Sequence, residues 1–127
     1  MINGSNYVPE SVTEIASAVH SDITNSSYEG VIFMIDVTAH DLGNADESYI
    51  FTIEGKDELS STYYTILASV NIRTGGGNGL YVLEVHPSLV EAANLKASNL
   101  LPDKFRLILT VGGTTPSVTY TVRVVLK

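Results

Sequence analysis

The feature that most constrains the fold is an alternation of apolar and polar residues near the end of the sequence. Over Ser117–Leu126, apolar side chains occupy every second position, and Thr119, Thr121 and Arg123 lie between them. Alternation with a period of two is typical of a β-strand that lies with one face on a hydrophobic core. Residues 105–111 repeat the pattern, and the turn-forming residues 112–116 separate the two segments. We therefore predict that the two segments form a hairpin.

Most of the remaining chain also has the residue types of β-strands. The run Val31–Val37 is apolar on both faces and predicts a central strand covered on both sides, and we expect Asp36 within it to accept backbone hydrogen bonds from a turn. Val12–Val19 is compatible with a strand or a helix, and its Ser and Thr content favours an edge strand. Further strands are predicted over residues 49–53, 63–72 and 80–85. The predicted core contains Phe33, Ile35, Phe51, Ile53, Leu107 and Tyr120.

Only Leu89–Ala97, between two prolines, has helical spacing, and it predicts at most one short helix in a crossover. Residues 74–79 are rich in glycine and predict a flexible hairpin tip. The fold class that follows is all-β: an antiparallel β-sandwich of about seven to eight strands, of immunoglobulin-like or jelly-roll type. We assign residues 1–10 to an N-terminal arm and residues 11–127 to a single sandwich domain, which suits a chain of 127 residues.

Composition excludes several classes of function. Seven Lys and Arg against fourteen Asp and Glu give a net charge of −7, which argues against a nucleic-acid partner. The sequence has no cysteine, so disulfides and thiolate chemistry are excluded. No apolar run is long enough to span a membrane, and no secretory signal precedes the strands. We expect a soluble protein made in the cytoplasm without a signal peptide.

No pattern in the sequence indicates catalysis. His20, His40 and His86 have no metal-site spacing, and His86 is predicted to close a strand without a catalytic role. No activated serine motif is present. The acidic loop Asp41–Glu47 offers oxygen ligands for calcium but lacks the EF-hand pattern, so a solvated turn is the preferred interpretation. We expect no enzyme activity, no metal and no cofactor.

Several short phrases resemble, in their order, those of small virion structural proteins of tailed bacteriophages. An apolar strand ends in Asp-Val-Thr-Ala at residues 36–39, and a segment of the type Phe-Thr-Ile-x-Gly-x-Asp follows at residues 51–57. Tyr-Tyr-Thr-x-Leu-Ala-Ser occupies residues 63–69, and Ser-x-Thr-Tyr-x-Val occupies residues 117–122. The phrases Val-x-Pro-x-Leu, Ala-Ala-Asn and Leu-Pro lie between them, at residues 85–102. The sequence departs from the family at His86, where Tyr is frequent, and in its longer glycine loop.

The resemblance implies a non-enzymatic β-sandwich of the virion, and capsid decoration or cement is the leading hypothesis. The partners would be the major capsid protein or other virion proteins, together with further copies of the chain in a homo-oligomer, for which a trimer fits. The alternatives are a neck or tail component, or a carbohydrate-binding module that attaches the virion to its host. Two segments are predicted to contact partners, the arm and the crossover Ser88–Asn99. The candidate contact residues are Ile2, Tyr7, Val8, Tyr63 and Tyr81.

Overall fold

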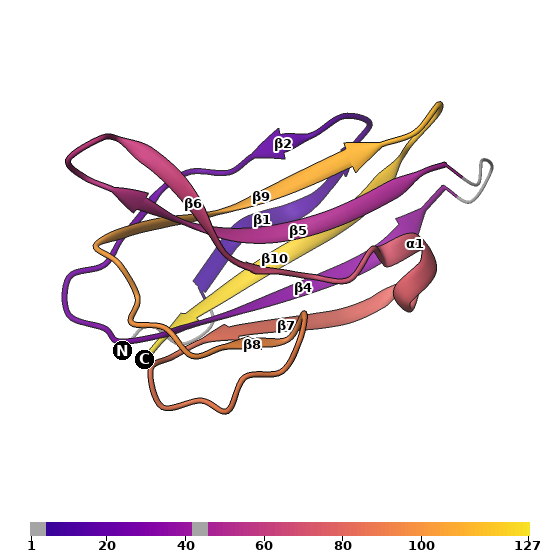
Figure 1. Ribbon diagram of the computed structural model, residues 1–127. Coiled ribbons are helices and arrows are strands. Elements are labelled where there is room, and N and C mark those ends of the chain that lie inside the picture. Colours follow the sequence, from indigo (N-terminus) through magenta and orange to yellow (C-terminus); the bar gives the residue numbers. More distant parts are fainter. Residues whose placement is uncertain (1–4, 42–45) are drawn as a thin grey trace.

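The alternating segment near the end of the sequence forms strand β10 (Val118–Leu126), which lies inside a five-stranded sheet, sheet A (Figure 1). The computed structural model describes residues 5–41 and 46–127. Along β10 every second side chain is buried, because one face of the sheet lies on the core. Sheet A has the strand order β1-β10-β4-β7-β8. Its other strands are β1 (Ser5–Glu14), β4 (Val31–His40), β7 (Gly79–Val85) and β8 (Lys96–Ala97).

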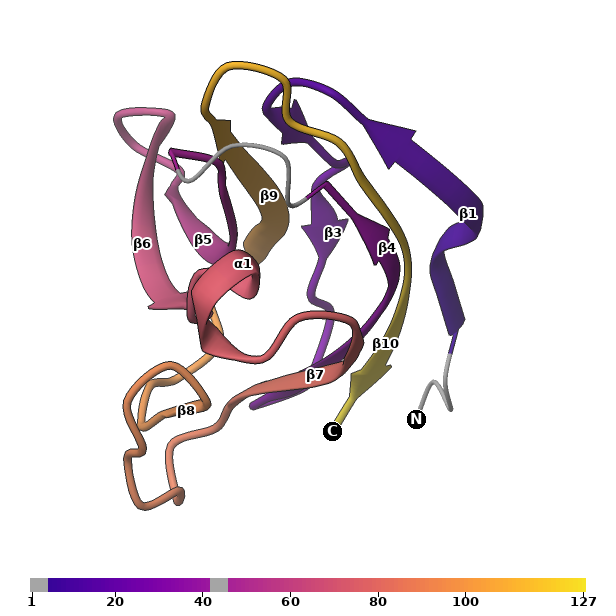
Figure 2. The ribbon, with the colours of Figure 1, turned by 90° about the vertical axis from the view of Figure 1, so that its right-hand side faces the viewer.

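A second sheet, sheet B, packs face to face on sheet A, and an end-on view shows the two layers (Figure 2). Its order is β2-β9-β5-β6, and β3 also pairs with β9. Its strands are β2 (Ala18–Val19), β3 (Ile23–Thr24), β5 (Ser48–Asp57), β6 (Thr62–Ala68) and β9 (Lys104–Gly112). Among the described strands only β7 and β8 pair in parallel. The predicted antiparallel β-sandwich is therefore confirmed, with seven long strands and three of two residues.

Aromatic rings fill the space between the sheets. Phe51 on sheet B meets Tyr120 on sheet A edge to face, with ring centroids 4.9 Å apart, and Phe33 meets Phe105 at 6.1 Å. Edge-to-face contact of this kind stabilises a core beyond the burial of apolar area. All six predicted core residues have no exposed surface, so their prediction is confirmed: Phe33, Ile35, Phe51, Ile53, Leu107 and Tyr120.

The predicted hairpin between residues 105–111 and 117–126 is wrong. Both strands exist, but β9 belongs to sheet B and pairs with β5, whereas β10 belongs to sheet A and pairs with β1 and β4. The connection between them passes from one sheet to the other. It turns at Gly113, whose φ of 109° is a conformation that glycine adopts without strain. The apolar faces of the two strands therefore both line the core, each from its own sheet.

The segment Leu89–Ala97, for which at most one short helix is predicted, forms no helix in the structure. The described segment is irregular apart from β8, and it folds back at Asn94, whose φ is positive at 64°. Backbone hydrogen bonds between Ala92 and Lys96 close this tight turn. Helical spacing over so few residues is overridden by the parallel pairing of β8 with β7.

One helical turn forms elsewhere, as α1 (Ile72–Gly75). The side chain of Asn71 caps it by accepting a hydrogen bond from the backbone N–H of Arg73. The strand predicted over residues 63–72 therefore ends at Ala68, and residues 74–79 are not a hairpin tip. They include the end of α1 and the loop that carries the chain from sheet B to sheet A.

The predicted N-terminal arm is a strand from Ser5 onward, because β1 pairs with β10, with register shifts between Asn6 and Val8 and between Val8 and Val12. Val8 is buried in the core, and the half-buried ring of Tyr7 lies edge to face against Phe33 at 5.6 Å. Apolar side chains of this segment therefore pack on the protein's own core. The predicted edge strand Val12–Val19 divides between the sheets, since β1 ends at Glu14 and the chain crosses to β2.

The outward face of β4 also differs from the prediction. Inward residues such as Ile35 are fully buried, but Ile32 and Met34 on the other face are only half-buried. Asp36 is exposed on that outward face, and no hydrogen bond joins its side chain to a turn within residues 5–41 and 46–127. A strand that is apolar on both faces thus leaves one face uncovered.

Candidate functional site

Four of the five predicted contact residues lie in the described part of the chain, and their side chains differ in burial and in hydrogen bonding. Ile2 lies outside the described residues, and Val8 is buried in the core. Tyr81 is half-buried on β7, and its hydroxyl donates to the carbonyl oxygen of Gly77 at 2.6 Å, which fastens the loop after α1. Burial raises the pKa of Tyr81 above its ordinary value. Tyr81 and Val8 therefore serve the fold of this chain.

Tyr63 lies on the outward face of sheet B, where it joins three elements. Its ring covers the guanidinium group of Arg106 on β9, with Cζ 3.4 Å from the ring centroid. Its hydroxyl donates to the carboxylate of Asp22 at 2.7 Å, and this bond is the main cause of a raised pKa for Tyr63. Arg106 in turn donates to Glu54 on β5 at 2.9 Å. One face of the tyrosine ring and its hydroxyl are thus occupied within the chain.

A second polar cluster lies between the sheets near β1. The Nε2 atom of His20 is 2.7 Å from the hydroxyl oxygen of Tyr120, and the ring of Tyr7 packs on His20. The hydroxyl of Tyr7 donates to the carbonyl oxygen of Ser21. Burial is the first cause of every pKa shift here: it raises the pKa of Tyr7 to about 12, raises that of Tyr120, and lowers that of His20.

The cluster predicts a loss of stability on mild acidification. Because burial lowers the pKa of His20 below about 6.5, the unfolded chain binds a proton on this ring at higher pH than the folded protein. The stabilisation is therefore fully present above about pH 6.5 and is lost as the pH falls through the folded-state pKa. Urea unfolding at about pH 7.5 and about pH 5.5 measures it. The His20→Gln variant should lose less stability between these two pH values, and an equal loss would contradict the prediction.

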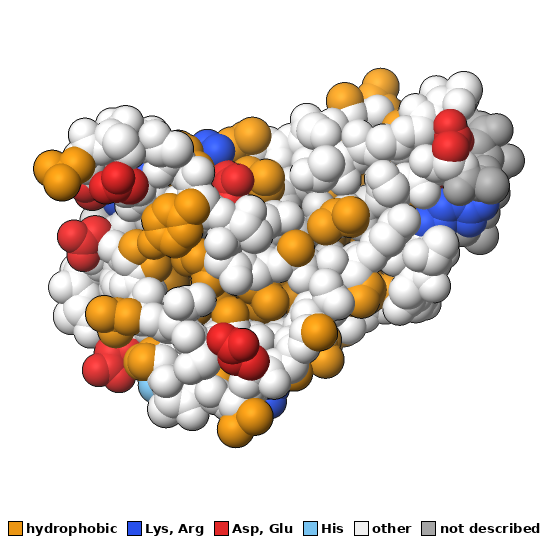
Figure 3. All heavy atoms as spheres, viewed as in Figure 1, with side chains coloured by type: hydrophobic (Ala, Val, Ile, Leu, Met, Phe, Trp, Pro, Cys, Tyr) orange, Lys and Arg blue, Asp and Glu red, His pale blue; other side chains and the backbone are white. Residues whose placement is uncertain are grey.

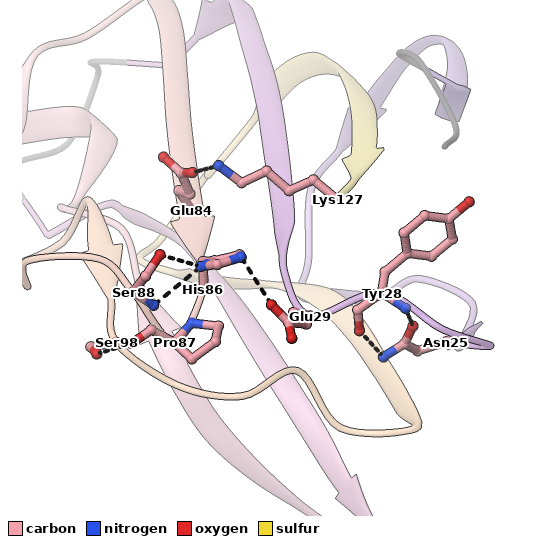
Figure 4. A network of polar contacts seen from close by, with 9 residues as sticks. All are labelled: Asn25, Tyr28, Glu29, Glu84, His86, Pro87, Ser88, Ser98 and Lys127. Atoms are coloured by element: carbon pink, nitrogen blue, oxygen red, sulfur yellow. Dashed lines mark hydrogen bonds and ion pairs between the residues drawn. The ribbon is translucent and has the colours of Figure 1, made fainter.

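A third cluster surrounds His86, at the end of β7 (Figure 4). Its Nδ1 atom accepts hydrogen bonds from the backbone N–H of Ser88 at 3.1 Å and from the hydroxyl of Ser88 at 2.8 Å. Its Nε2 atom lies 3.6 Å from the carboxylate of Glu29, whose side chain is 67% exposed. Serine, histidine and glutamate are the residue types of a hydrolase triad.

The geometry around His86 is nevertheless that of a capped turn. A backbone N–H can only donate, so Nδ1 of His86 must accept and the ring proton lies on Nε2, toward Glu29. The Ser88 hydroxyl shares that single acceptor with the amide of its own residue. The cluster therefore fixes the direction in which the chain leaves β7, in agreement with the expected strand-closing histidine.

The segment that leaves β7, residues 88–100, is anchored at both ends. The hydroxyl of Ser98 donates to the carbonyl oxygen of Pro87 at 3.1 Å, and the side-chain amide of Asn94 donates to the carbonyl oxygen of Ala68 on β6 at 3.0 Å. Beyond the segment, the N–H of Leu101 donates to the carbonyl oxygen of Glu29. These bonds hold an irregular segment in one conformation.

Three large apolar side chains of the segment 88–100 face solvent. Val90 is 86% exposed, Leu100 is 69% exposed and Leu95 is 50% exposed. In the space-filling view, apolar side chains gather on this side of the molecule, around a hollow between β6 and β8 (Figure 3). Exposed apolar side chains on an ordered segment are typical of a protein–protein contact. This segment is our candidate functional site.

The acidic loop Asp41–Glu47, for which a solvated turn is the preferred interpretation, lies only partly within the described residues, because residues 42–45 are outside them. Glu47 is buried, and its carboxylate accepts a hydrogen bond from the hydroxyl of Tyr49 at 2.9 Å. Over residues 5–41 and 46–127, no three His, Asp or Glu side chains lie close enough together to hold a metal ion. No helix in the same part of the chain is long and apolar enough to cross a membrane.

The sequence was also compared with known proteins. No protein-family model matches it, and no curated protein or solved structure does. The resemblance of its short phrases to phage virion proteins is therefore an expectation that these comparisons leave open.

Proposed function

We propose that the protein is a non-enzymatic structural protein of a bacteriophage virion that decorates the capsid shell. The observation that carries the proposal is the ordered segment 88–100, with Val90, Leu95 and Leu100 turned to solvent. Apolar side chains held in place before binding lose little conformational entropy when a partner covers them. This arrangement suits a protein whose function is to bind a partner through surface contact.

The polar clusters support a function without catalysis. The Ser88 hydroxyl caps a turn, Tyr81 fastens a loop, and the Tyr63 hydroxyl is bonded to Asp22. In each case the group that could react or bind is used to hold elements of the chain together. The short phrases that resemble those of phage virion proteins supply the choice of partner, the major capsid protein.

Attachment through the segment 88–100 can be tested on virions prepared without the protein. We expect the double variant Val90→Ser, Leu100→Ser to bind such particles more weakly by on the order of tenfold or more. Leu59→Ser is the matched control, because Leu59 is 98% exposed in the turn between β5 and β6. Counting bound copies measures the effect, and equal occupancy for all three proteins would refute attachment through this segment.

The copy number of the protein in the virion separates capsid decoration from the alternative neck or tail position. Decoration requires copies in proportion to the capsid lattice, whereas a neck or tail ring contains few. A host-attachment module is the other alternative, and Tyr64 would be its sugar-stacking residue, because this residue is 47% exposed and its ring lies against Gly55. Loss of adsorption to host cells in Tyr64→Ala, with normal copy number, would favour that function.

A further inference from the structure

The outward face of sheet A carries a second apolar surface, which the segment 88–100 does not include. It is formed by β4, β7 and β10, and we call it the sheet A face. Leu80 is 62% exposed and Val82 is 39% exposed, although both lie in a regular strand. Strand pairing places Met34 of β4 beside Val82, whereas Leu80 lies beside Asp36. The apolar members of the face are Ile32, Met34, Leu80, Val82 and Val125.

Four charged residues lie on or beside this face, and two of them pair with each other. Lys127 forms an ion pair with Glu84 on β7. Asp36 and Arg123 are both exposed, and neither forms an ion pair within the part of the chain that the structure describes. Since Asp36 is opposite Thr121 and Arg123 is opposite Met34, the two charges are diagonal neighbours on β4 and β10. The face thus presents one acid and one base, side by side, among apolar residues.

We propose that two copies of the protein pack through the sheet A face about a two-fold axis. In such an isologous interface every contact is made twice, so Arg123 of each copy lies on Asp36 of the other. A face that carries both an acid and a base beside apolar side chains is complementary to itself. This local complementarity matters because the whole chain has a net charge of −7, and surfaces without it would repel one another. The proposal is independent of virion attachment.

Sedimentation of the purified protein over a wide range of concentrations tests the proposal. We expect a monomer–dimer equilibrium that salt weakens, because the two ion pairs lie near the protein surface. Arg123→Asp and Asp36→Arg each place like charges opposite each other twice. Each variant should therefore weaken dimerisation by on the order of tenfold to a hundredfold.

Mixing the two variants gives the sharpest result. In a heterodimer of Arg123→Asp with Asp36→Arg, each acid again faces a base, so the mixture should dimerise more strongly than either variant does alone. Glu58→Arg is the matched control, since it changes the net charge as Asp36→Arg does but lies in the turn between β5 and β6. Unchanged circular dichroism spectra establish that the variants fold.

Three outcomes would overturn the proposal. The first is a protein that stays monomeric at every concentration, and the second is a trimer. The third is a mixture of the two variants that sediments as monomers while the wild-type protein dimerises. Each outcome leaves the capsid-binding assay with Val90 and Leu100 unaffected, so failure here is distinguishable from failure of the proposed function.

Discussion

Replacement of Phe51 by alanine should lower the free energy of unfolding by about 3–5 kcal/mol. Phe51 is fully buried on β5, and its ring meets Tyr120 of the opposite sheet edge to face. Removing the ring leaves a cavity between two sheets whose backbones are fixed by their own hydrogen bonds, so the cavity cannot collapse fully. Urea unfolding followed by circular dichroism measures the change.

A neighbouring residue on the other face of sheet B is the control for Phe51. Thr110 is exposed on β9, and Thr110→Ala should change the free energy of unfolding by no more than about 0.5 kcal/mol. Similar losses for the two variants would mean that the assignment of inward and outward faces in sheet B is wrong.

Replacement of Gly30 by alanine should destabilise the protein by about 1–3 kcal/mol. The added Cβ atom would lie 2.5 Å from the carbonyl oxygen of Val85 and 2.7 Å from Cδ2 of His86. The backbone of Gly30 cannot move away easily, because its N–H and C=O groups both bond to the backbone of Lys127. Thermal unfolding and urea unfolding should both show the loss.

Gly112→Ala is the matched control for Gly30→Ala, since Gly112 also lies at a strand end. There the Cβ atom would meet only the hydroxyl oxygen of Ser48, at 2.9 Å, and that side chain can rotate. Alanine also restricts the unfolded chain, so this variant should be neutral or more stable by up to about 1 kcal/mol. If Gly30→Ala were as well tolerated as Gly112→Ala, the close approach of Gly30 to Val85 would be refuted.

The sequence was sufficient to predict strands and the core because both depend on local alternation. Phe51 and Tyr120 fall on apolar faces that a period of two identifies without any knowledge of partners. Which strand pairs with which is a different question. Alternation predicts that β9 and β10 each have an apolar face. The same pattern fits two strands paired in one sheet and two strands in opposite sheets of a sandwich, so it does not distinguish between them.

Other contacts that local patterns did not reveal have a similar origin. Residues 1–10 contain few apolar side chains, but two of these, Tyr7 and Val8, reach a core built mostly by later strands. The bond from Tyr63 to Asp22 joins residues 41 positions apart, and no local pattern marks it. For the candidate site, the crossover Ser88–Asn99 was predicted to contact partners because it lacks a core role, and that remains a prediction. Which of its side chains face solvent follows only from the tight turn at Asn94 and its anchors.

The place of β10 in sheet A has a consequence for biosynthesis. In the described structure β1 pairs with no strand other than β10, which also forms one of the two neighbours of β4. A nascent chain that has not yet reached Val118 therefore holds both strands with unpaired edges, and unpaired edges invite association with other chains. Folding of the sandwich must wait until the ribosome has delivered the strand that joins them, and pairing of such distant segments is slow. A nascent chain stalled before Val118 should therefore remain open to proteases and chaperones, and one extended beyond Leu126 should become resistant.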